Sequence, residues 1–355
     1  MKPKLMLILS LSLPVQVLLI FWASQNEPWI ETNYAMAIFP FIAQAMSFLY
    51  SAIPFSMGDI FYIILIFMMV KWLIGLFYTK KYQLKHKLLQ MISFLAVVYF
   101  IFNLFWGLNN YRLPIHQKLD LSTDYTTAEL KSISCQLIDA VNKEQNRLTT
   151  SDTAMVTFPD KNDFKASVQQ SFVSMQQNEL ITRLPSATIK SSLFSTALTY
   201  AGFSGYYNPF TNESQINALV PAFRRPTIMA HEKAHQIGYA KENEANFIAC
   251  MVTINSRDRL LRYSGLSYAL KHCLNDLYFR DKAMREALIS DLNPGVIKNF
   301  KKLSLFWSKY DNPFEPVMKV IYGHFLKANN QPKGIKTYNY VVALLVNYYQ
   351  KTPTL

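Results

Sequence analysis

Residues 231–246 read His231-Glu232-Lys233-Ala234-His235-Gln236-Ile237-Gly238 and then Tyr239-Ala240-Lys241-Glu242-Asn243-Glu244-Ala245-Asn246. Two histidines four positions apart on a helix point from the same face, so both imidazoles can reach one metal ion. The glutamate after the first histidine can then act as a general base on a water molecule beside the metal. An exposed charged helix with two incidental histidines is the alternative, but apolar Ala230, Ala234 and Ile237 would pack such a helix against a core. The pattern therefore predicts Zn²⁺ between His231 and His235, with Glu232 as the catalytic base.

A third ligand is expected a few residues downstream, and Glu242 and Glu244 both qualify. Gly238 should end the first helix, and a second should run from about residue 240 to 259. Glu242 and Asn246 share a face of that second helix, whereas Glu244 lies about 200° away from Glu242. Because a metal ligand needs a hydrogen-bond partner nearby, Asn246 favours Glu242. Glu244 remains the alternative ligand, or an ordinary helix charge.

This region resembles the gluzincin metallopeptidases, whose third zinc ligand is a glutamate placed four before an Asp or Asn. The run 242–246 is similar to helices of the CAAX-protease, HtpX and ImmA types, although those families place more sequence before the glutamate. It resembles more closely a group of bacterial membrane proteins, the domain of unknown function 3810, with HE-x-x-H-x-x-G and E-x-E-A-N after three apolar segments. That resemblance extends to Trp106-Gly107-Leu108-Asn109 and Gly205-Tyr206-Tyr207-Asn208-Pro209-Phe210. It implies a zinc peptidase-like domain and names no substrate.

The first hundred residues are typical of a membrane protein. Uncharged or nearly uncharged stretches cover residues 5–23, 60–78 and 88–108, each long enough to cross a bilayer. A fourth apolar stretch, residues 34–55, contains Pro40 and Pro54. With three spans, Lys2 and Lys4 share a side with the lysine-rich loop at 80–87, as the positive-inside rule requires. We therefore expect residues 34–55 to form an interfacial or re-entrant helix.

This topology predicts a cell-membrane protein with a cytoplasmic N-terminus and an extracytoplasmic catalytic domain. The first segment has no clear cleavage site after Ala23, which favours an uncleaved anchor. The membrane domain would end near residue 109, and residues 110–355 would form the second domain. The formal net charge is +13, which suits a surface near anionic lipid. Nothing in the sequence resembles a nucleic-acid-reading motif, and three cysteines are too few for a disulfide framework.

Residues 110–355 are predicted to form a zincin-like α+β domain that is mostly helical. Thr126 and Glu129 form a capping-box pattern before an apolar helix. Residues 155–158, 187–190 and 214–220 are predicted strands, and residues 202–210 a loop or tight turn. The strand at 214–220 precedes the metal helix, so it is either an edge on which an extended substrate pairs or an ordinary sheet strand.

The predicted activity is hydrolysis of a peptide bond in a peptide or protein substrate. A donor for the developing oxyanion is also needed, and Tyr338, Tyr340, His324 and Tyr207 are the candidates. Zinc-dependent hydrolysis of a cell-envelope amide would use the same residues. A non-catalytic, zinc-stabilised membrane scaffold is the alternative of another class. Glu232 argues against a scaffold, because a structural zinc site needs no general base.

Overall fold

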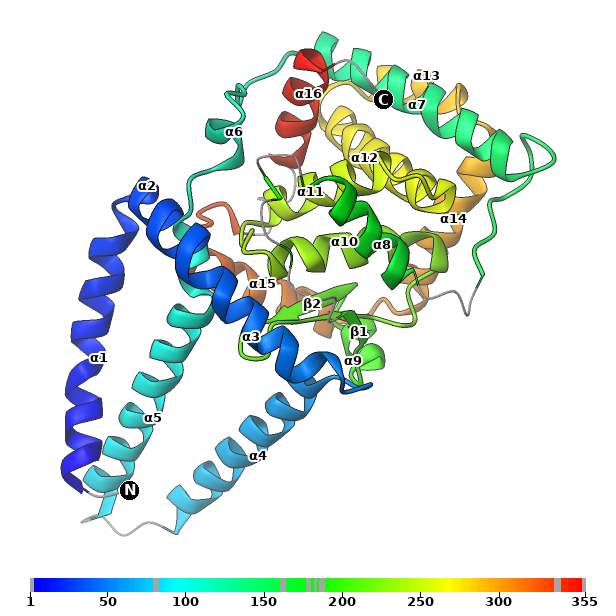
Figure 1. The fold of residues 1–355 in the computed structure, drawn as a ribbon. Helices are drawn as coiled ribbons and strands as arrows, with labels where there is room; N and C mark the ends of the chain where they lie inside the picture. The colour runs from blue at the N-terminus through cyan, green and yellow to red at the C-terminus, as the bar shows by residue number, and fades with distance from the viewer. Residues whose placement is uncertain are drawn as a thin grey trace.

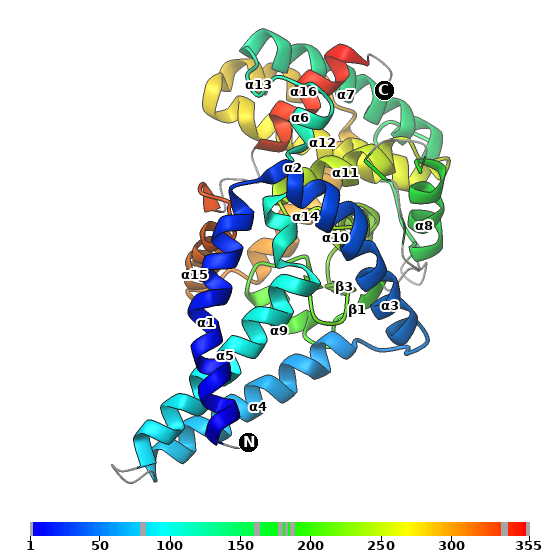
Figure 2. The same cartoon turned by 60° about the vertical axis from the view of Figure 1, so that its left-hand side comes forward.

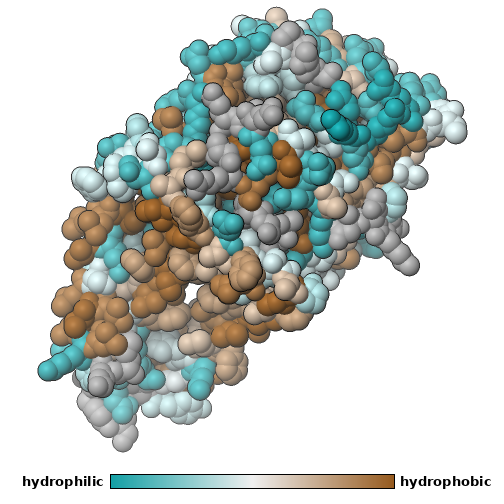
Figure 3. All heavy atoms as spheres, in the orientation of Figure 1, coloured by the Kyte–Doolittle hydropathy of each residue, from teal (hydrophilic) through white to brown (hydrophobic). Residues whose placement is uncertain are grey.

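Three long apolar helices project from one end of a mostly helical domain (Figure 1). They are α1 (Pro3–Ser24), α4 (Met57–Phe77) and α5 (Leu84–Phe105). The structure is a computed structural model that describes residues 3–78, 83–159, 164–176, 180–181, 184, 189–334 and 340–352. Each of the three helices begins within about four residues of the predicted apolar segment, as expected from hydropathy. Figure 3 shows the hydrophobic surface concentrated over these helices and the hydrophilic surface over the domain.

A fourth helical segment runs between the domain-side ends of α1 and α4 (Figures 1 and 2). It consists of α2 (Glu27–Trp29), a π-helix η1 (Ile30–Ile38) and α3 (Phe39–Ser51). The prediction placed this element at residues 34–55. It begins earlier because the Asn26 side chain accepts a hydrogen bond from the backbone N–H of Trp29 and so caps the helix at Glu27. By length and composition Glu27–Ser51 could also cross a membrane, which makes four such helices in the described chain.

One face of this segment is bound to the domain. Glu31 forms an ion pair with Arg112, with an oxygen–nitrogen distance of 2.8 Å. The Asn212 side-chain amide donates to the Ala43 carbonyl at 2.9 Å and to the Ser47 hydroxyl at 3.0 Å. These groups would otherwise be buried polar atoms without partners, so the contacts fix the segment across the domain surface.

The remaining helices form the domain in which the predicted metal helix lies. Several belong to its first part: η3 (Gly107–Tyr111), α6 (Ile115–Lys118), α7 (Thr127–Leu148), α8 (Lys165–Ser174), α9 (Ser195–Tyr200) and η4 (Ala222–Arg224). The others are α10 (Arg225–Gln236), α11 (Glu242–Ile254), α12 (Arg259–Arg280), α13 (Lys282–Ser290), α14 (Pro294–Lys309), α15 (Phe314–Ala328) and α16 (Val341–Lys351). The capping box that starts α7 is confirmed: Thr126 accepts from the Glu129 N–H, and Glu129 accepts from the Thr126 N–H.

Helix α11 is the centre of the domain core. Except for Asn243, all of its residues are buried, because α8, α10, α12 and α16 surround it. Fully burying each of its large apolar side chains, such as Phe247 and Ile248, stabilises the fold by about 1.5–3 kcal/mol. A helix that is buried on all sides gives a rigid base for the residues at its first turn.

A small sheet lies beside α10, and here the sequence prediction needs correction. Its described strands are β1 (Ile189–Ser191), β2 (Gly205–Asn208) and β3 (Glu213–Ile216), in the order β1-β3-β2. Strand β3 pairs in parallel with β1 and antiparallel with β2. Residues 202–210 were predicted as a loop, but β2 occupies part of them. Of the predicted strand at 187–190, Ala187 and Thr188 lie outside the described residues.

Two other predicted strands differ from the structure. The strand predicted at 214–220 ends at Ile216 and is the middle strand, so it cannot be the substrate edge. Residues 155–158 form no strand, because the Asn299 side chain takes the place of a partner strand. It accepts from the Val156 N–H and donates to the Val156 carbonyl, each at 3.1 Å.

Candidate functional site

Helix α10 carries the two histidines on one face. Pro226 stands in its first turn, where the missing N–H costs no hydrogen bond, and the helix ends at Gln236. Gly238 follows with a φ of +91°, as the predicted helix stop requires. A Cβ at this position would also lie about 3 Å from Phe39, Arg112 and Asn109. The tight turn brings the start of α11 back toward the histidines.

Three candidate ligand atoms meet at this turn. His231 Nε2 lies 3.1 Å from His235 Nε2, and Glu242 Oε2 lies 3.2 Å from the first nitrogen and 3.6 Å from the second. Zinc bonds of about 2.0–2.1 Å in a tetrahedral site separate neighbouring ligand atoms by about 3.3 Å. The triangle formed by these three atoms therefore has the dimensions of one face of a zinc tetrahedron.

Glu232 also lies close enough to the histidines to be considered as a ligand. The donor atoms of His231, Glu232 and His235 lie within 4.8 Å of one another. Glu242 fits a ligand position, because its Oε2 lies 3.2 Å and 3.6 Å from the two ring nitrogens and its other oxygen is held by Tyr322. This geometry leaves Glu232 beside the three ligand atoms, where a general base would stand.

Hydrogen bonds orient the candidate ligand side chains. His235 Nδ1 lies 2.7 Å from the Tyr239 carbonyl oxygen, which can only accept, so Nδ1 carries the proton. That tautomer leaves Nε2 available to a metal. The Tyr322 hydroxyl donates to Glu242 Oε1 at 2.5 Å, leaving Oε2 directed at the histidines. The Trp106 indole N–H donates to the His235 carbonyl at 3.3 Å and so connects α10 to the end of α5.

The electrostatics of the cluster follow from burial and from opposite charges. Burial raises the pKa of Glu242, but the His235 and His231 imidazoles outweigh this and hold it well below its ordinary range. Burial lowers the pKa of His235, but the Glu242 carboxylate outweighs it and raises this pKa to about 9. Burial raises the pKa of Glu232 to about 7, although His231 and His235 lower it. A carboxyl group with a pKa near neutrality can accept and release a proton at physiological pH.

A cavity of about 440 Å³ opens onto the cluster. His231, Glu232, His235 and Glu242 all line it. Glu232 Oε2 is buried without a hydrogen-bond partner among the described residues. A Cβ built on Gly205 would lie 2.8 Å from the other Glu232 oxygen, so β2 passes directly over this carboxylate. A substrate in the cavity would therefore reach Glu232 and the edge of the sheet together.

Two other predicted residues of α11 have different partners. Glu244 Oε1 accepts from the Ile115 N–H at 2.9 Å, which binds the glutamate to the start of α6 and away from the histidines. Asn246 does not pair with Glu242 as predicted. Its Oδ1 accepts from the Tyr268 hydroxyl at 2.5 Å, and its Nδ2 has no hydrogen-bond partner among the described residues. The residue that does support Glu242 is Tyr322.

Of the predicted oxyanion donors that the structure describes, one lines the cavity and two do not. Tyr207 lines the cavity, but its hydroxyl donates to Asn212 Oδ1 at 2.6 Å and is already used. His324 is exposed on α15 and does not line the cavity, and Tyr340 is 45% exposed at the start of α16. Tyr338 lies outside the described residues. Sequence reasoning missed Tyr322, because its one signal is its position on α15 beside an apolar stripe, and tyrosines are frequent in this chain.

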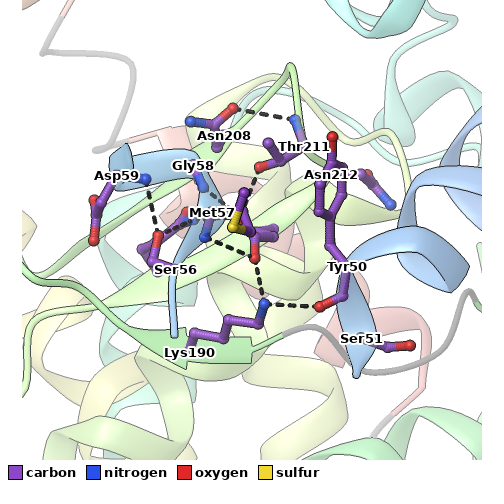
Figure 4. A network of polar contacts seen from close by, with 12 residues as sticks. Tyr50, Ser51, Ser56, Met57, Gly58, Asp59, Lys190, Asn208, Thr211 and Asn212 are labelled. Atoms are coloured by element: carbon purple, nitrogen blue, oxygen red, sulfur yellow. Dashed lines mark hydrogen bonds and ion pairs between the residues drawn. The ribbon is translucent and has the colours of Figure 1, made fainter. Parts of the chain in front are cut away.

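A buried polar network ties the start of α4 to the sheet (Figure 4). The fully buried Glu213 accepts from the backbone N–H groups of Met57 at 3.3 Å and Gly58 at 2.5 Å. Lys190 donates to Glu213 Oε1 at 2.5 Å and to the Tyr50 carbonyl at 2.8 Å. An anion at the N-terminus of α4 also complements the helix dipole. The network holds the α3–α4 turn against β1 and β3.

These features define a mostly helical protein with N-terminal apolar helices and, where they meet the domain, a largely buried His/Glu cluster formed by His231, Glu232, His235 and Glu242. The sequence model of the family described as protein of unknown function (DUF3810) matches residues 34–346, and the chain belongs to this family. That match confirms the resemblance to the domain of unknown function 3810, while the peptidase character stays a prediction. The comparison with curated proteins and the comparison with solved structures find no match. Function is therefore inferred from the geometry of the site.

Proposed function

We propose that this chain is a membrane-anchored, zinc-dependent peptidase of the gluzincin kind. His231, His235 and Glu242 would hold Zn²⁺, and Glu232 would be the general base. The observation that carries the proposal is the triangle of ligand atoms, with sides of 3.1, 3.2 and 3.6 Å, at the wall of a cavity. Three protein ligands leave a fourth zinc position open, which is the mark of a catalytic rather than a structural zinc site.

The residues around the triangle supply the other parts of a hydrolase. When bound, Zn²⁺ polarises a carbonyl group and lowers the pKa of water toward about 7. The Glu232 carboxylate has a pKa near 7 and one oxygen without a hydrogen-bond partner among the described residues, so it can accept a proton from water and deliver one to a leaving amine. Tyr322 positions Glu242 through its hydroxyl. The cluster therefore contains a proton acceptor, Glu232, and a proposed ligand, Glu242, that a hydrogen bond orients.

Strand β2 supports a peptide as the substrate. The Asn217 N–H donates to the Ser204 carbonyl at 2.9 Å, so this pair is hydrogen-bonded in the antiparallel ladder. Because such pairs alternate, the backbone N–H and C=O groups of Gly205 and Tyr207 face away from β3. Both residues line the cavity. An extended peptide could pair with this edge and pass Glu232.

The proposed topology has three spans, formed by α1, α4 and α5, with the N-terminus cytoplasmic and the site outside. Two observations support it. The lysines of the 80–87 loop would then lie on the cytoplasmic side. The contacts of Glu31, Ala43 and Ser47 with the domain support a position of the segment Glu27–Ser51 on the domain surface.

Metal analysis combined with a peptide-library assay tests the proposal. The purified full chain should contain about one zinc per chain. His235→Ala should lose the metal. His324→Ala, which replaces an exposed histidine, is the control and should keep it. Glu232→Gln should keep the metal and abolish cleavage of the library. Zinc retention by His235→Ala would refute the ligand assignment, and full activity of Glu232→Gln would refute the general base.

A further inference from the structure

The cavity at the His/Glu cluster is built partly from the membrane helices. Tyr62 of α4 and Phe102 of α5 line it, together with Trp106 at the end of α5. Outside His231, Glu232, His235 and Glu242, none of the described lining residues carries a charge. Most of the other lining residues are apolar or aromatic, among them Leu198, Phe203, Phe210, Phe325 and Leu326. The cavity is therefore suited to apolar side chains and has one wall formed by the ends of apolar helices.

Helix α15 extends this apolar wall to the protein surface. Phe314, Val317, Ile321 and Phe325 recur at helical spacing and are 44–56% exposed. The adjoining face of the helix carries Tyr322 and Leu326, which line the cavity, and the Tyr322 ring stacks on Phe325 with centroids 6.0 Å apart. Phe325 is both exposed and part of the lining, so the apolar stripe continues into the cavity at its rim.

The exposed apolar stripe of α15 lies next to the apolar helices, and this position indicates which surface covers it. Helices α5 and α15 border the same cavity, and Asn330, just after α15, donates to the Asn110 carbonyl at 3.1 Å. An exposed apolar face next to apolar helices is suited to the acyl region of a bilayer, as in interfacial amphipathic helices. The cavity rim at Phe325 would then face lipid.

We propose that the site cleaves polypeptides close to a bilayer anchor, where the chain leaves the membrane. This inference rests on the proposed peptidase function and adds the class of substrate. The anchored segment enters past Phe325 and Tyr62, and the adjoining extended residues pair with β2. One water molecule is consumed: its oxygen bonds to the carbonyl carbon and the peptide C–N bond breaks. One water hydrogen passes to the amine nitrogen, and the other remains with the new carboxyl group.

The first test uses the full chain in liposomes with a randomised linker of about 30 residues attached to an oligo-leucine transmembrane segment. Cleavage sites are mapped by mass spectrometry, so that partition of the substrate into the bilayer does not bias the result. We expect sites clustered within roughly ten residues of the anchor, a distance of about 35 Å in an extended chain. Glu232→Gln is the control and should give no cleavage.

The outcomes separate this inference from the proposed function. Clustered, Glu232-dependent cleavage supports both. Glu232-dependent cleavage spread evenly along the linker overturns the anchored substrate and leaves the peptidase intact. Absence of Glu232-dependent cleavage in a zinc-loaded protein overturns the peptidase itself, and the substrate class falls with it.

A second test examines the membrane contact without relying on activity. The chain is reconstituted with a phospholipid that carries a photoactivatable group in its acyl chain, and the labelled peptides are mapped. Residues 314–325 should be labelled. Phe279, which is 77% exposed at the end of α12, is the matched control and should remain unlabelled. Equal labelling of both regions, or no labelling of α15, would overturn the placement of this helix at the bilayer.

Discussion

The Tyr322 hydroxyl connects the C-terminal part of the chain to the His/Glu cluster. Tyr322 donates to Glu242 Oε1 at 2.5 Å, while its ring packs on Phe203 with centroids 5.2 Å apart. Replacing Tyr322 by Phe removes the hydroxyl and keeps the ring contact. Partners of this kind contribute about 10–100-fold to metal affinity.

We therefore expect Tyr322→Phe to weaken zinc binding by at least about tenfold while leaving thermal stability nearly unchanged. Competition with a chromophoric chelator measures the affinity. Tyr340→Phe, a change at an exposed tyrosine, is the control and should bind zinc as the unaltered chain does. Equal affinity in the two variants would show that Tyr322 does not orient Glu242.

Lys233 lies in α10 between Glu232 and His235, and we expect its buried charge to lower the stability of the folded protein. Its ammonium group is fully buried, with Gln236 Oε1 at 3.2 Å, and burial lowers the pKa of Lys233 to about 7. The unfolded chain keeps this pKa near about 10.4. Between these two pH values the unfolded chain binds more protons, so stability rises with pH and the full penalty is present below about pH 7.

Lys233→Met should therefore stabilise the protein at pH 7 by on the order of 2 kcal/mol. The gain should shrink as the pH approaches about 10. Thermal unfolding in detergent across this pH range measures it, and Lys302→Met, on the exposed face of α14, is the control. A loss of stability on Lys233→Met would mean that the ammonium group is compensated.

At the scale of elements, the Glu213 network joins the sheet to the first turn of α4. Glu213→Gln removes the negative charge beside the buried Lys190 and weakens two backbone hydrogen bonds. Breaking a buried pair in this way costs about 3–5 kcal/mol. We expect a lower melting temperature than for Glu286→Gln, a change to an exposed acid on α13. The double variant Lys190→Met/Glu213→Leu should recover part of the loss, since no buried charge is left unpaired.

The elements that sequence predicted well are those whose signals are local. Helix α10, its stop at Gly238 and the capped start of α7 each depend on residues within a few positions of one another. Strand β2 was missed because Gly, Tyr, Asn and Pro are typical of a turn, and its pairing with β3 is a tertiary effect. The strand predicted at 155–158 does not form, because the Asn299 side chain of α14 takes the place of a partner strand.

The residues of the candidate site show the same difference between local signals and long-range contacts. His231, Glu232, His235 and Glu242 lie within twelve consecutive positions, so the geometry of one helix and the turn at Gly238 bring them together. The predicted partner Asn246 lies on the correct helix but is taken by Tyr268, and the residue that supports Glu242 comes from eighty positions away. Such long-range partners follow from the packing of α15 and leave no mark near the motif.

At the scale of the whole molecule, the cluster lies where the membrane helices join the domain. Trp106, at the end of α5, contacts the His235 backbone, and Arg112 donates to the Gly238 carbonyl at 3.1 Å. Arg112 also pairs with Glu31 of η1. The turn that places Glu242 is thus held from the side of the apolar helices, so the orientation of these helices would set the compartment in which the site lies.

Labelling of introduced cysteines in intact cells tests that orientation. In a Cys135→Ser background, with Cys250 and Cys273 fully buried, Lys131→Cys places a thiol on exposed α7 and Lys85→Cys places one at the start of α5. With three spans, a membrane-impermeant maleimide should label residue 131 in intact cells and residue 85 only after permeabilisation. If Glu27–Ser51 also crosses the bilayer, the two results exchange, because the domain then lies inside. We expect the first pattern, since a crossing would separate Ala43 and Ser47 from Asn212 and leave its buried amide without these partners.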